Sequence, residues 1–145
     1  MRIGTFISDT GGRRSTVDEI VENARWCEQA GLAGAWVPYL PWSLDAFLAL
    51  SVAAQATERV ELGTAVVPTY PFHPMAMARS ALSLNAIAHG RLALGIGPSH
   101  QSVIESMYGL SYDHAADHTR EYVMALHSAF AGDGAGASGT ANIEP

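Results

Sequence analysis

The chain has 145 residues, of which 48% are hydrophobic and 15% are charged, and its formal net charge at pH 7 is −6. This length suits one globular domain, and the composition excludes the polar, highly charged sequences that stay unfolded. The acidic balance also argues against a nucleic-acid partner, because phosphate binding needs clustered Lys and Arg. Arg13 and Arg14 form the only adjacent basic pair, which a solvated loop explains more simply than a phosphate site.

The number of cysteines and the length of the apolar runs indicate the cellular compartment of the protein. Cys27 is the only cysteine, so it can form neither an internal disulfide nor a zinc cluster, and we expect a reducing, cytoplasmic setting. No apolar run reaches the length of about 18 residues that a membrane span needs, and no secretory leader is expected. The sequence therefore predicts a cytoplasmic protein without a membrane partner.

Short β-type runs alternate with amphipathic helical stretches from residue 1 to about residue 97. Thr16 and Glu19 match a capping box that begins the first helix, and Gly31 provides its left-handed end. Pro74 suits the first turn of a later helix, which Gly90 ends. The expected strands are residues 2–7, 34–37, 60–67 and 91–97, and the later helices are expected at 45–57, 74–89 and 115–130.

Strands separated by helices of this length form βαβ units, so the predicted sheet is parallel. Either an open doubly wound sheet or a closed barrel uses such units, and periodicity does not choose between them. We assign residues 1–131 to one domain. Residues 132–145 are mostly Gly, Ala and Ser, which predicts a flexible tail.

Several motifs occur in the same order as in one known family. They are MRIG (1–4), EQAGL (28–32), AWVP (35–38), RVELGTAV (59–66), PFHP (71–74), GRLALGIGPSH (90–100), YG (108–109) and TREY (119–122). Together they resemble the luciferase-like monooxygenase superfamily, especially its branch that uses the deazaflavin coenzyme F-420. The resemblance covers roughly residues 1–130.

The resemblance implies a fold and an activity. The fold is the N-terminal half of a (β/α)₈ TIM barrel, with about four parallel βα units and a site at the C-terminal ends of the strands. A whole barrel needs about 250 residues, so we expect a truncated chain. The implied activity is that of an oxidoreductase or monooxygenase. It would use coenzyme F-420, or alternatively FMN, for hydride transfer to or from a small organic substrate.

The resemblance also implies where the cofactor lies. In relatives the third strand ends in a bulge with a non-proline cis peptide against the ring, and here that bond falls between Ala65 and Val66. Without the resemblance, the same segment reads as an ordinary buried strand end. The implied cofactor contacts are Tyr39, Ala65, Val66, Pro68, Gly97, Pro98, Ser99 and Val103.

Candidate residues for proton transfer and substrate binding are fewer. His100 follows the fourth strand, where an imidazole can shuttle a proton near neutral pH, although a single histidine at the rim is more often a hydrogen-bonding surface residue. Trp42 and His73 are expected to line the substrate pocket or else to pack in loops. The dehydrogenase branch carries an Asp-His pair where this chain has Tyr39 and Leu40, which argues against a sugar-phosphate dehydrogenase.

Two weaker patterns are interpreted structurally. Residues 95–97 read Gly-Ile-Gly, but the third glycine of a dinucleotide fingerprint is missing and we expect no helix directly after them. His114 and His118 have a spacing that could hold a metal on one helical face, but no third ligand is evident. We therefore expect a polar helix start there and no metal site.

Two alternatives to the oxidoreductase stay open. One is a non-catalytic half-barrel that associates with itself or a partner, because an incomplete barrel exposes its sheet edges. The other is an unrelated doubly wound nucleotide-binding domain, which a non-sequential strand order would support.

Overall fold

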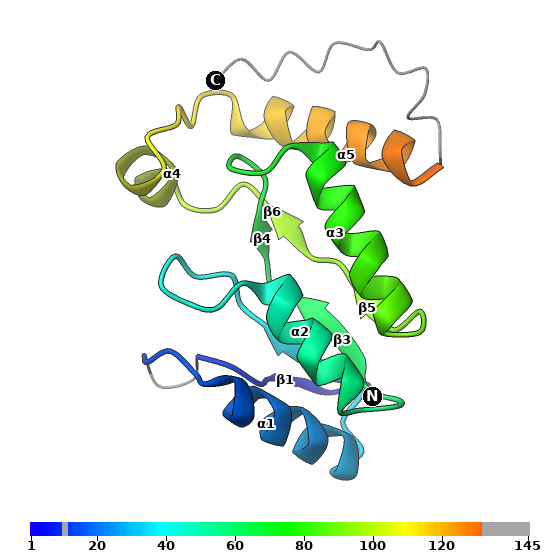
Figure 1. The fold of residues 1–145 in the computed structure, drawn as a ribbon. Helices are drawn as coiled ribbons and strands as arrows, with labels where there is room; N and C mark the ends of the chain where they lie inside the picture. Colours follow the sequence, from blue (N-terminus) through cyan, green and yellow to red (C-terminus); the bar gives the residue numbers. More distant parts are fainter. Residues whose placement is uncertain (10–11, 132–145) are drawn as a thin grey trace. The chain divides into compact units, whose positions relative to one another are not determined.

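The computed structural model describes residues 1–9 and 12–131, so the predicted Gly/Ala/Ser tail lies outside the described residues. The chain divides into two compact units (Figure 1). The sheet unit comprises Met1–Val67 and Ala81–Ile96, and the aromatic unit comprises Pro68–Ser80 and the chain from Gly97 onward.

The sheet unit is built on four parallel strands in the order β1-β2-β3-β5 (Figure 1). The strands are β1 (Gly4–Phe6), β2 (Gly34–Val37), β3 (Glu61–Thr64) and β5 (Leu92–Ala93). This order follows the chain, as in a barrel, and the predicted parallel sheet is confirmed. It removes the support that a non-sequential order would have given to the doubly wound alternative.

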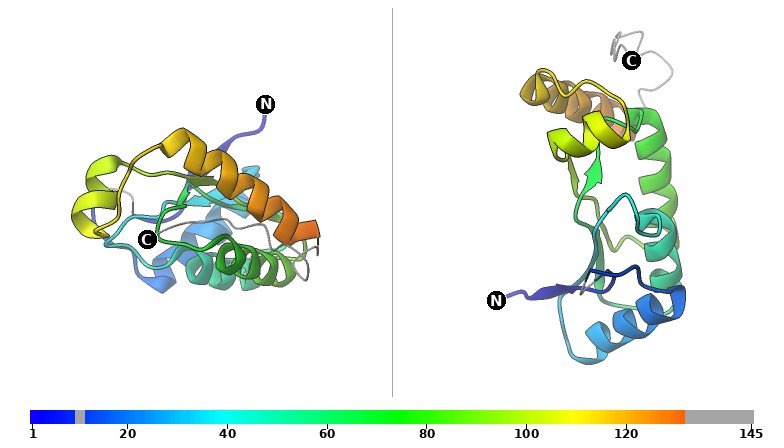
Figure 2. Two further views of the ribbon diagram at one scale, coloured as in Figure 1. Left: turned by 90° about the horizontal axis from the view of Figure 1, so that it is seen from above. Right: turned by 90° about the vertical axis from the view of Figure 1, so that its left-hand side faces the viewer.

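Helices α1 (Val17–Gln29) and α2 (Ala46–Gln55) cover one face of this sheet (Figure 2). Ala35 and Val37 of β2 are buried on that face. Because side chains alternate along a strand, Trp36 lies on the opposite face, where Phe6 is 50% exposed. The Trp36 indole covers three glycines, and a Cβ atom added at Gly4, Gly34 or Gly63 would overlap it.

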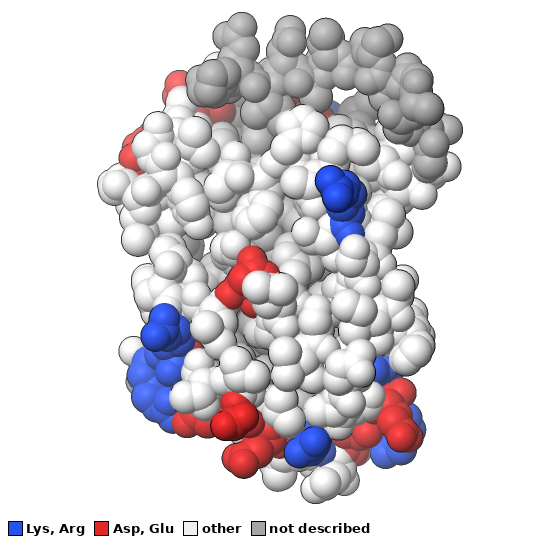
Figure 3. Space-filling model, viewed as in Figure 1, with Lys and Arg blue, Asp and Glu red and all other residues white. Residues whose placement is uncertain are grey.

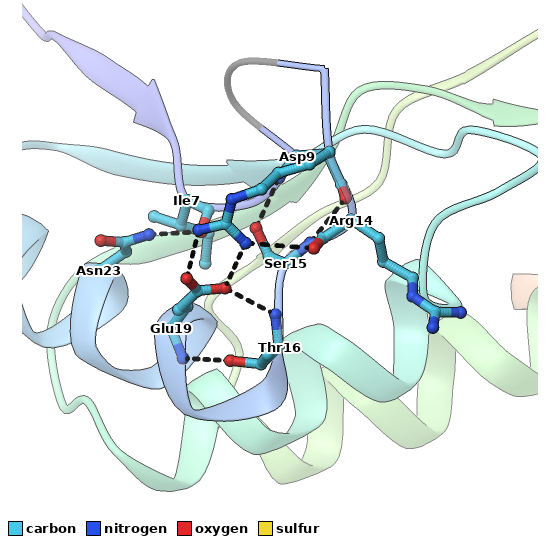
Figure 4. Close-up of polar contacts among 8 residues, drawn as sticks. Ile7, Asp9, Arg14, Ser15, Thr16, Glu19 and Asn23 are labelled. Carbon is cyan, nitrogen blue, oxygen red and sulfur yellow. Dashed lines mark hydrogen bonds and ion pairs between the residues drawn. The ribbon is translucent and has the colours of Figure 1, made fainter.

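Helix α1 begins at the predicted capping box (Figure 4). The Glu19 backbone N–H donates to the Thr16 hydroxyl over 3.2 Å, and the Thr16 N–H donates to the Glu19 carboxylate over 2.8 Å. Gly31 follows the helix with a φ of +70°, as predicted. Cys27 is fully buried on the inner face of the helix, where it packs as a small side chain.

Two predicted strands are each divided in two. Residues 60–67 were expected to be one strand, but pairing stops after β3 and resumes in β4 (Val67–Pro68). Residues 91–97 likewise give β5 and a separate β6 (Ile96–Gly97), which pairs with β4. The prediction of two uninterrupted strands was wrong because the Gly95 backbone hydrogen-bonds to the Thr64 side chain. These bonds replace the regular backbone ladder at this point.

Helix α3 (Pro74–Ile87) begins at Pro74 as predicted. Its first part, as far as Ser80, belongs to the aromatic unit, and the remainder belongs to the sheet unit. Met77 is fully buried, whereas Met75 and Leu82 are 44% and 50% exposed. Gly90 has a φ of +81° after the helix, in keeping with its predicted role as the helix end.

The aromatic unit contains α4 (Gln101–Met107) and α5 (Ala115–Ala131). Helix α5 was predicted, whereas α4 was not. As expected, no helix begins directly after Gly97, since residues 98–100 separate it from α4. Helix α4 has seven residues, of which Ile104 is fully buried. So short an apolar pattern gives little periodic signal.

Two charged side chains of the sheet unit bond to backbone atoms of loops. The Arg91 guanidinium makes five hydrogen bonds, to the Thr57 hydroxyl and to four carbonyl oxygens between residues 54 and 88. The Glu28 carboxylate accepts from the backbone N–H groups of Glu58, Arg59 and Val60 at 2.6–3.2 Å. Both side chains fix the chain segment between α2 and β3.

The surface charges are mixed in sign. Most of the face shown in Figure 3 is uncharged, and side chains of both signs gather mainly at its lower end. The Arg2 and Glu61 side chains of the sheet unit form an ion pair at 3.1 Å. Among the described residues, no helix combines the length and apolar character needed to cross a membrane.

Candidate cofactor site

The predicted non-proline cis peptide is present between Ala65 and Val66, directly after β3. Backbone hydrogen bonds of 2.9 Å hold the chain on both sides of it, from Ala65 N–H to the Val37 carbonyl and from Val67 N–H to the Gly95 carbonyl. The Val66 side chain between them is 44% exposed. The segment is therefore a fixed bulge with an apolar side chain open to solvent, which corrects the alternative of an ordinary buried strand end.

Thr64 and Gly95 lock this bulge. The Thr64 hydroxyl donates to the Gly95 carbonyl and accepts from the Gly95 N–H, both at 2.8 Å, and Thr64 is 1% exposed. A Cβ atom at Gly95 would overlap the Thr64 carbonyl oxygen and contact Val66. Sequence reasoning missed both residues. A glycine inside a predicted strand was the available signal, since it often marks a bulge or a close backbone approach.

The segment after β1 is closed by paired hydrogen bonds (Figure 4). The Asp9 N–H donates to the Ser15 hydroxyl at 2.9 Å, and the Ser15 N–H donates to the Asp9 carboxylate at 3.1 Å. The Arg13 guanidinium beside Glu19 lowers the pKa of that carboxyl to about 2. Arg13 therefore serves the helix start, which agrees with a solvated loop.

The segment after β2 carries the candidates Tyr39 and Trp42. The Tyr39 hydroxyl donates to the Asp45 carboxylate over 3.2 Å, and the same carboxylate caps α2 by accepting from the Leu48 N–H over 3.0 Å. Trp42 is 57% exposed in this segment. Tyr39 is thus held by the start of α2, whereas Trp42 is open to solvent.

Within the aromatic unit, the 97–100 loop joins β6 to α4. The Gly97 carbonyl accepts from the Thr69 N–H over 2.9 Å. Ser99 has a φ of +68°, and its carbonyl accepts from the Tyr112 hydroxyl over 2.8 Å. His100 is exposed and precedes α4 without bonding to the helix through its side chain.

A cluster of aromatic rings adjoins this loop. The Tyr70 and His118 rings stack with centroids 3.9 Å apart, and Tyr70 also stacks on Tyr112 with centroids 5.3 Å apart. The His118 Nε2 atom lies 3.0 Å from the Thr69 hydroxyl. Burial lowers the pKa of His118 below its ordinary value. Sequence reasoning missed this cluster, because its members are far apart in the chain.

The cluster also corrects the interpretation of the two histidines near the start of α5. His114 has a φ of +52° and precedes the helix, so it does not share a helical face with His118. The ring of His118 is engaged by Tyr70 and Thr69 instead. No group of three or more metal-ligating side chains occurs in residues 1–9 and 12–131.

The remaining candidates lie in the aromatic unit. His73 is exposed, and its Nδ1 atom accepts from the Met75 N–H over 3.2 Å at the start of α3. Val103 is half-buried in α4, and Pro68 is buried in β4. The bulge and Tyr39 belong to the sheet unit, whereas Pro68, the 97–100 loop and Val103 belong to the aromatic unit.

Parallel strands that follow one another in chain order, with helices between them, are the arrangement of the early part of a (β/α)₈ barrel. The sequence profile of the luciferase-like monooxygenase family matches residues 1–143, and the chain belongs to that family. The resemblance inferred from the motifs is thereby confirmed.

Curated relatives share about a third of their sequence with the matched region. The chain is 32% identical over 115 residues to the 5,10-methylenetetrahydromethanopterin reductase of Methanolobus tindarius, covering 79% of this chain and 35% of the relative. It is 35% identical over 105 residues to the F-420-dependent glucose-6-phosphate dehydrogenase of Beutenbergia cavernae, covering 70% and 29%. The chain thus spans about a third of the length of these relatives.

Solved structures confirm the fold. An F-420-dependent secondary alcohol dehydrogenase in complex with an F-420–acetone adduct matches with a TM-score of 0.74 and 24% identity, over 88% of this chain and 41% of that one. The FMN-bound oxygenating constituent of 3,6-diketocamphane monooxygenase from Pseudomonas putida matches with a TM-score of 0.73 and 21% identity, over 86% and 38%. The chain therefore has the fold of part of a luciferase-like TIM barrel.

Proposed function

We propose that this chain forms the cofactor-binding part of an oxidoreductase that uses coenzyme F-420 or FMN. The observation that carries the proposal is the bulge at Ala65 and Val66, which backbone hydrogen bonds hold on both sides and which leaves the Val66 side chain exposed. A flavin-type ring needs a flat apolar wall on one face, and a rigid bulge with an open valine has the character of such a wall. The residues present therefore fit the group.

The cofactor would supply the hydride chemistry, and the chain's residues would bind and orient it. Ala65 and Val66 would contact the ring, while Gly97, Pro98 and Ser99 would contact its polar edge or side chain. His100 is exposed, so its imidazole is open to a small organic substrate and would be the candidate group for proton transfer.

Coenzyme F-420 is the preferred cofactor. Two of the curated relatives named above are a methanopterin reductase and an F-420-dependent dehydrogenase, while a structural relative binds FMN. Tyr39 and Leu40 replace the Asp-His pair of the sugar-phosphate branch, so the proposed substrate is not a sugar phosphate. FMN is the alternative, since the same apolar wall accepts either ring.

A binding titration tests the proposal. The purified chain is titrated with F-420 and, separately, with FMN, and ring fluorescence is followed. We expect micromolar binding of one of them, and Val66→Asp should weaken it at least about tenfold by placing a charge against the ring. Val52→Asp is the matched control, because Val52 is 40% exposed on the outer surface of α2. Lack of binding by the folded chain would contradict the proposal.

A second candidate function is self-association without catalysis. Strand β1 is at one edge of the four-stranded sheet, and Ile3 and Phe6 beside this edge are 52% and 50% exposed. Unpaired strand edges with apolar neighbours readily pair with another chain, here a second copy. Light scattering coupled to sizing chromatography should show a dimer, whereas a monomer at high protein concentration would exclude this candidate.

A further inference from the structure

The hydroxyl of Tyr112 bonds to the loop that the proposed function assigns to the cofactor. It donates to the Ser99 carbonyl over 2.8 Å from a position thirteen residues further along the chain. Ser99 has a φ of +68°, a left-handed conformation that residues other than glycine seldom adopt. A bond to its carbonyl stabilises that conformation directly, because rotating the peptide away would break the bond.

The Tyr112 ring is itself held in place by contacts with neighbouring aromatic residues. It stacks on Tyr70, and the Tyr70 hydroxyl donates to the Asp113 carbonyl over 3.3 Å, next to Tyr112 in the chain. The His118 ring also stacks on the Tyr70 ring, with centroids 3.9 Å apart, and its Nε2 atom hydrogen-bonds with the Thr69 hydroxyl. The stack thus connects the segment after β4 with the start of α5.

The contacts also return to the loop itself. Thr69 donates its backbone N–H to the Gly97 carbonyl, two residues before Ser99. The 97–100 loop is therefore hydrogen-bonded at Gly97 by Thr69 and at Ser99 by Tyr112. These two residues are connected to each other through the aromatic stack. Meanwhile, the hydroxyl of Ser99 has no hydrogen-bond partner among the described residues, and His100 is exposed, so polar groups of this loop stay open to a ligand.

We propose that Tyr112 is a positioning residue that holds Ser99 in its left-handed conformation and so presents the 97–100 loop to the bound cofactor. This inference rests on the proposed function, since it takes the loop to contact F-420 or FMN. Tyr112 acts through Ser99, and it does not touch the reacting atoms.

Removing one hydroxyl group tests the inference. Tyr112→Phe keeps the ring in the stack and deletes only the bond to Ser99. A single net hydrogen bond corresponds to roughly a fivefold change in an equilibrium constant, so the dissociation constant of the preferred cofactor should rise about fivefold in the full chain. Tyr108→Phe is the matched control: Tyr108 follows α4, and its hydroxyl makes no hydrogen bond among the described residues. Equal affinities of the two variants would overturn the inference.

A second substitution separates positioning from general support. Glycine adopts positive φ without steric cost, so Ser99→Gly removes the need for the Tyr112 bond. If Tyr112 works by holding the backbone of residue 99, Tyr112→Phe should change the dissociation constant less than about twofold in a Ser99→Gly background. An undiminished effect there would mean that Tyr112 acts elsewhere, and the inference would be wrong.

The two proposals fail in different ways. If the folded wild-type chain binds neither cofactor, the proposed function fails and the inference built on it fails as well. If the wild-type chain binds and Tyr112→Phe behaves like Tyr108→Phe, only the inference fails. Amide hydrogen exchange provides a readout without cofactor: exchange at residues 99–101 should be faster in Tyr112→Phe than in Tyr108→Phe, and unchanged protection would count against the inference.

Discussion

The two units of this protein are stabilised by different kinds of contact. In the sheet unit, strands pair in chain order, and the charged groups of Arg91 and Glu28 bond to backbone atoms of the segment before β3. In the aromatic unit, side chains bond to side chains and to loop carbonyls, as Tyr70, Tyr112 and His118 do. Regular backbone structure thus fixes one unit, and individual side chains fix the other.

This difference can be measured because the two units contain different chromophores. All three tryptophans, at positions 26, 36 and 42, lie in the sheet unit. Four of the five tyrosines, at positions 70, 108, 112 and 122, lie in the aromatic unit. Tryptophan fluorescence therefore reports unfolding of the sheet unit, and near-ultraviolet tyrosine dichroism mainly reports the aromatic unit.

Arg91→Met should have the largest effect on the sheet unit. It removes five hydrogen bonds and leaves several carbonyl oxygens without partners, so we expect a loss of about 3 kcal/mol in the free energy of unfolding. Urea denaturation followed by tryptophan fluorescence measures it. Arg25→Met, on the exposed surface of α1, should change little. Equal effects would show that the bonds of Arg91 are not what stabilises this unit.

Gly95→Ala should destabilise the bulge by about 2 kcal/mol, because the new methyl group would overlap the Thr64 carbonyl and the backbone would have to shift. Gly109→Ala is the control: Gly109 has a φ of +68° with open space around its Cα, so only backbone strain of about 1 kcal/mol is expected. Thermal melts rank the two. Gly95→Ala should also abolish cofactor binding. Unchanged binding would show that the bulge is not part of the cofactor site.

Glu28→Gln should cost about 1–2 kcal/mol, because a neutral amide accepts the three backbone N–H donors less strongly than a carboxylate. Burial alone would raise the pKa of Glu28, but these donors hold it below its ordinary value. Its contribution is therefore present above about pH 4.3 and is lost as pH falls further. Stability measured from pH 7 to pH 3 should fall less in the variant, with Glu22→Gln as the exposed control.

The smallest effect is expected from His118, in the aromatic unit. Burial lowers the pKa of this imidazole, so the unfolded chain binds a proton more readily, and stability is lost as pH falls below about 6.5. His118→Gln keeps a partner for Thr69 and should flatten this pH dependence in tyrosine dichroism, at a cost below about 1 kcal/mol at pH 8. His127→Gln, exposed on the same helix, should leave the dependence intact. A pH profile unchanged by His118→Gln would contradict the assignment.

The fold of the sheet unit was largely predictable from local patterns. Thr16 and Glu19 predicted the start of α1, and short β-type runs predicted the strands. Pro74, in the aromatic unit, predicted the start of α3. The division of the last two strands was missed, because it depends on Thr64 meeting Gly95, thirty-one residues away. Helix α4 was missed because seven residues carry too short a pattern.

The candidate site was predictable only where the family resemblance reached it. The resemblance placed the cis peptide at Ala65 and Val66, where the structure has it. It gave no indication of Tyr112 or of the stack of Tyr70 on His118, whose partners are forty-eight residues apart. Contacts between distant loops leave no periodic trace in a sequence, so they require the structure.

The Trp36 side chain restricts which residues can occupy three other positions. Its indole occupies the space that side chains at Gly4, Gly34 and Gly63 would need, across three neighbouring strands. Enlarging Gly34 or Gly63 demands a smaller residue at position 36, whereas a Cβ atom at Gly4 would also overlap the Gly34 carbonyl oxygen. Gly34, Gly63 and Trp36 should therefore change as a set during divergence, and a library that varies these three together should yield folded proteins far more often than one that varies them singly.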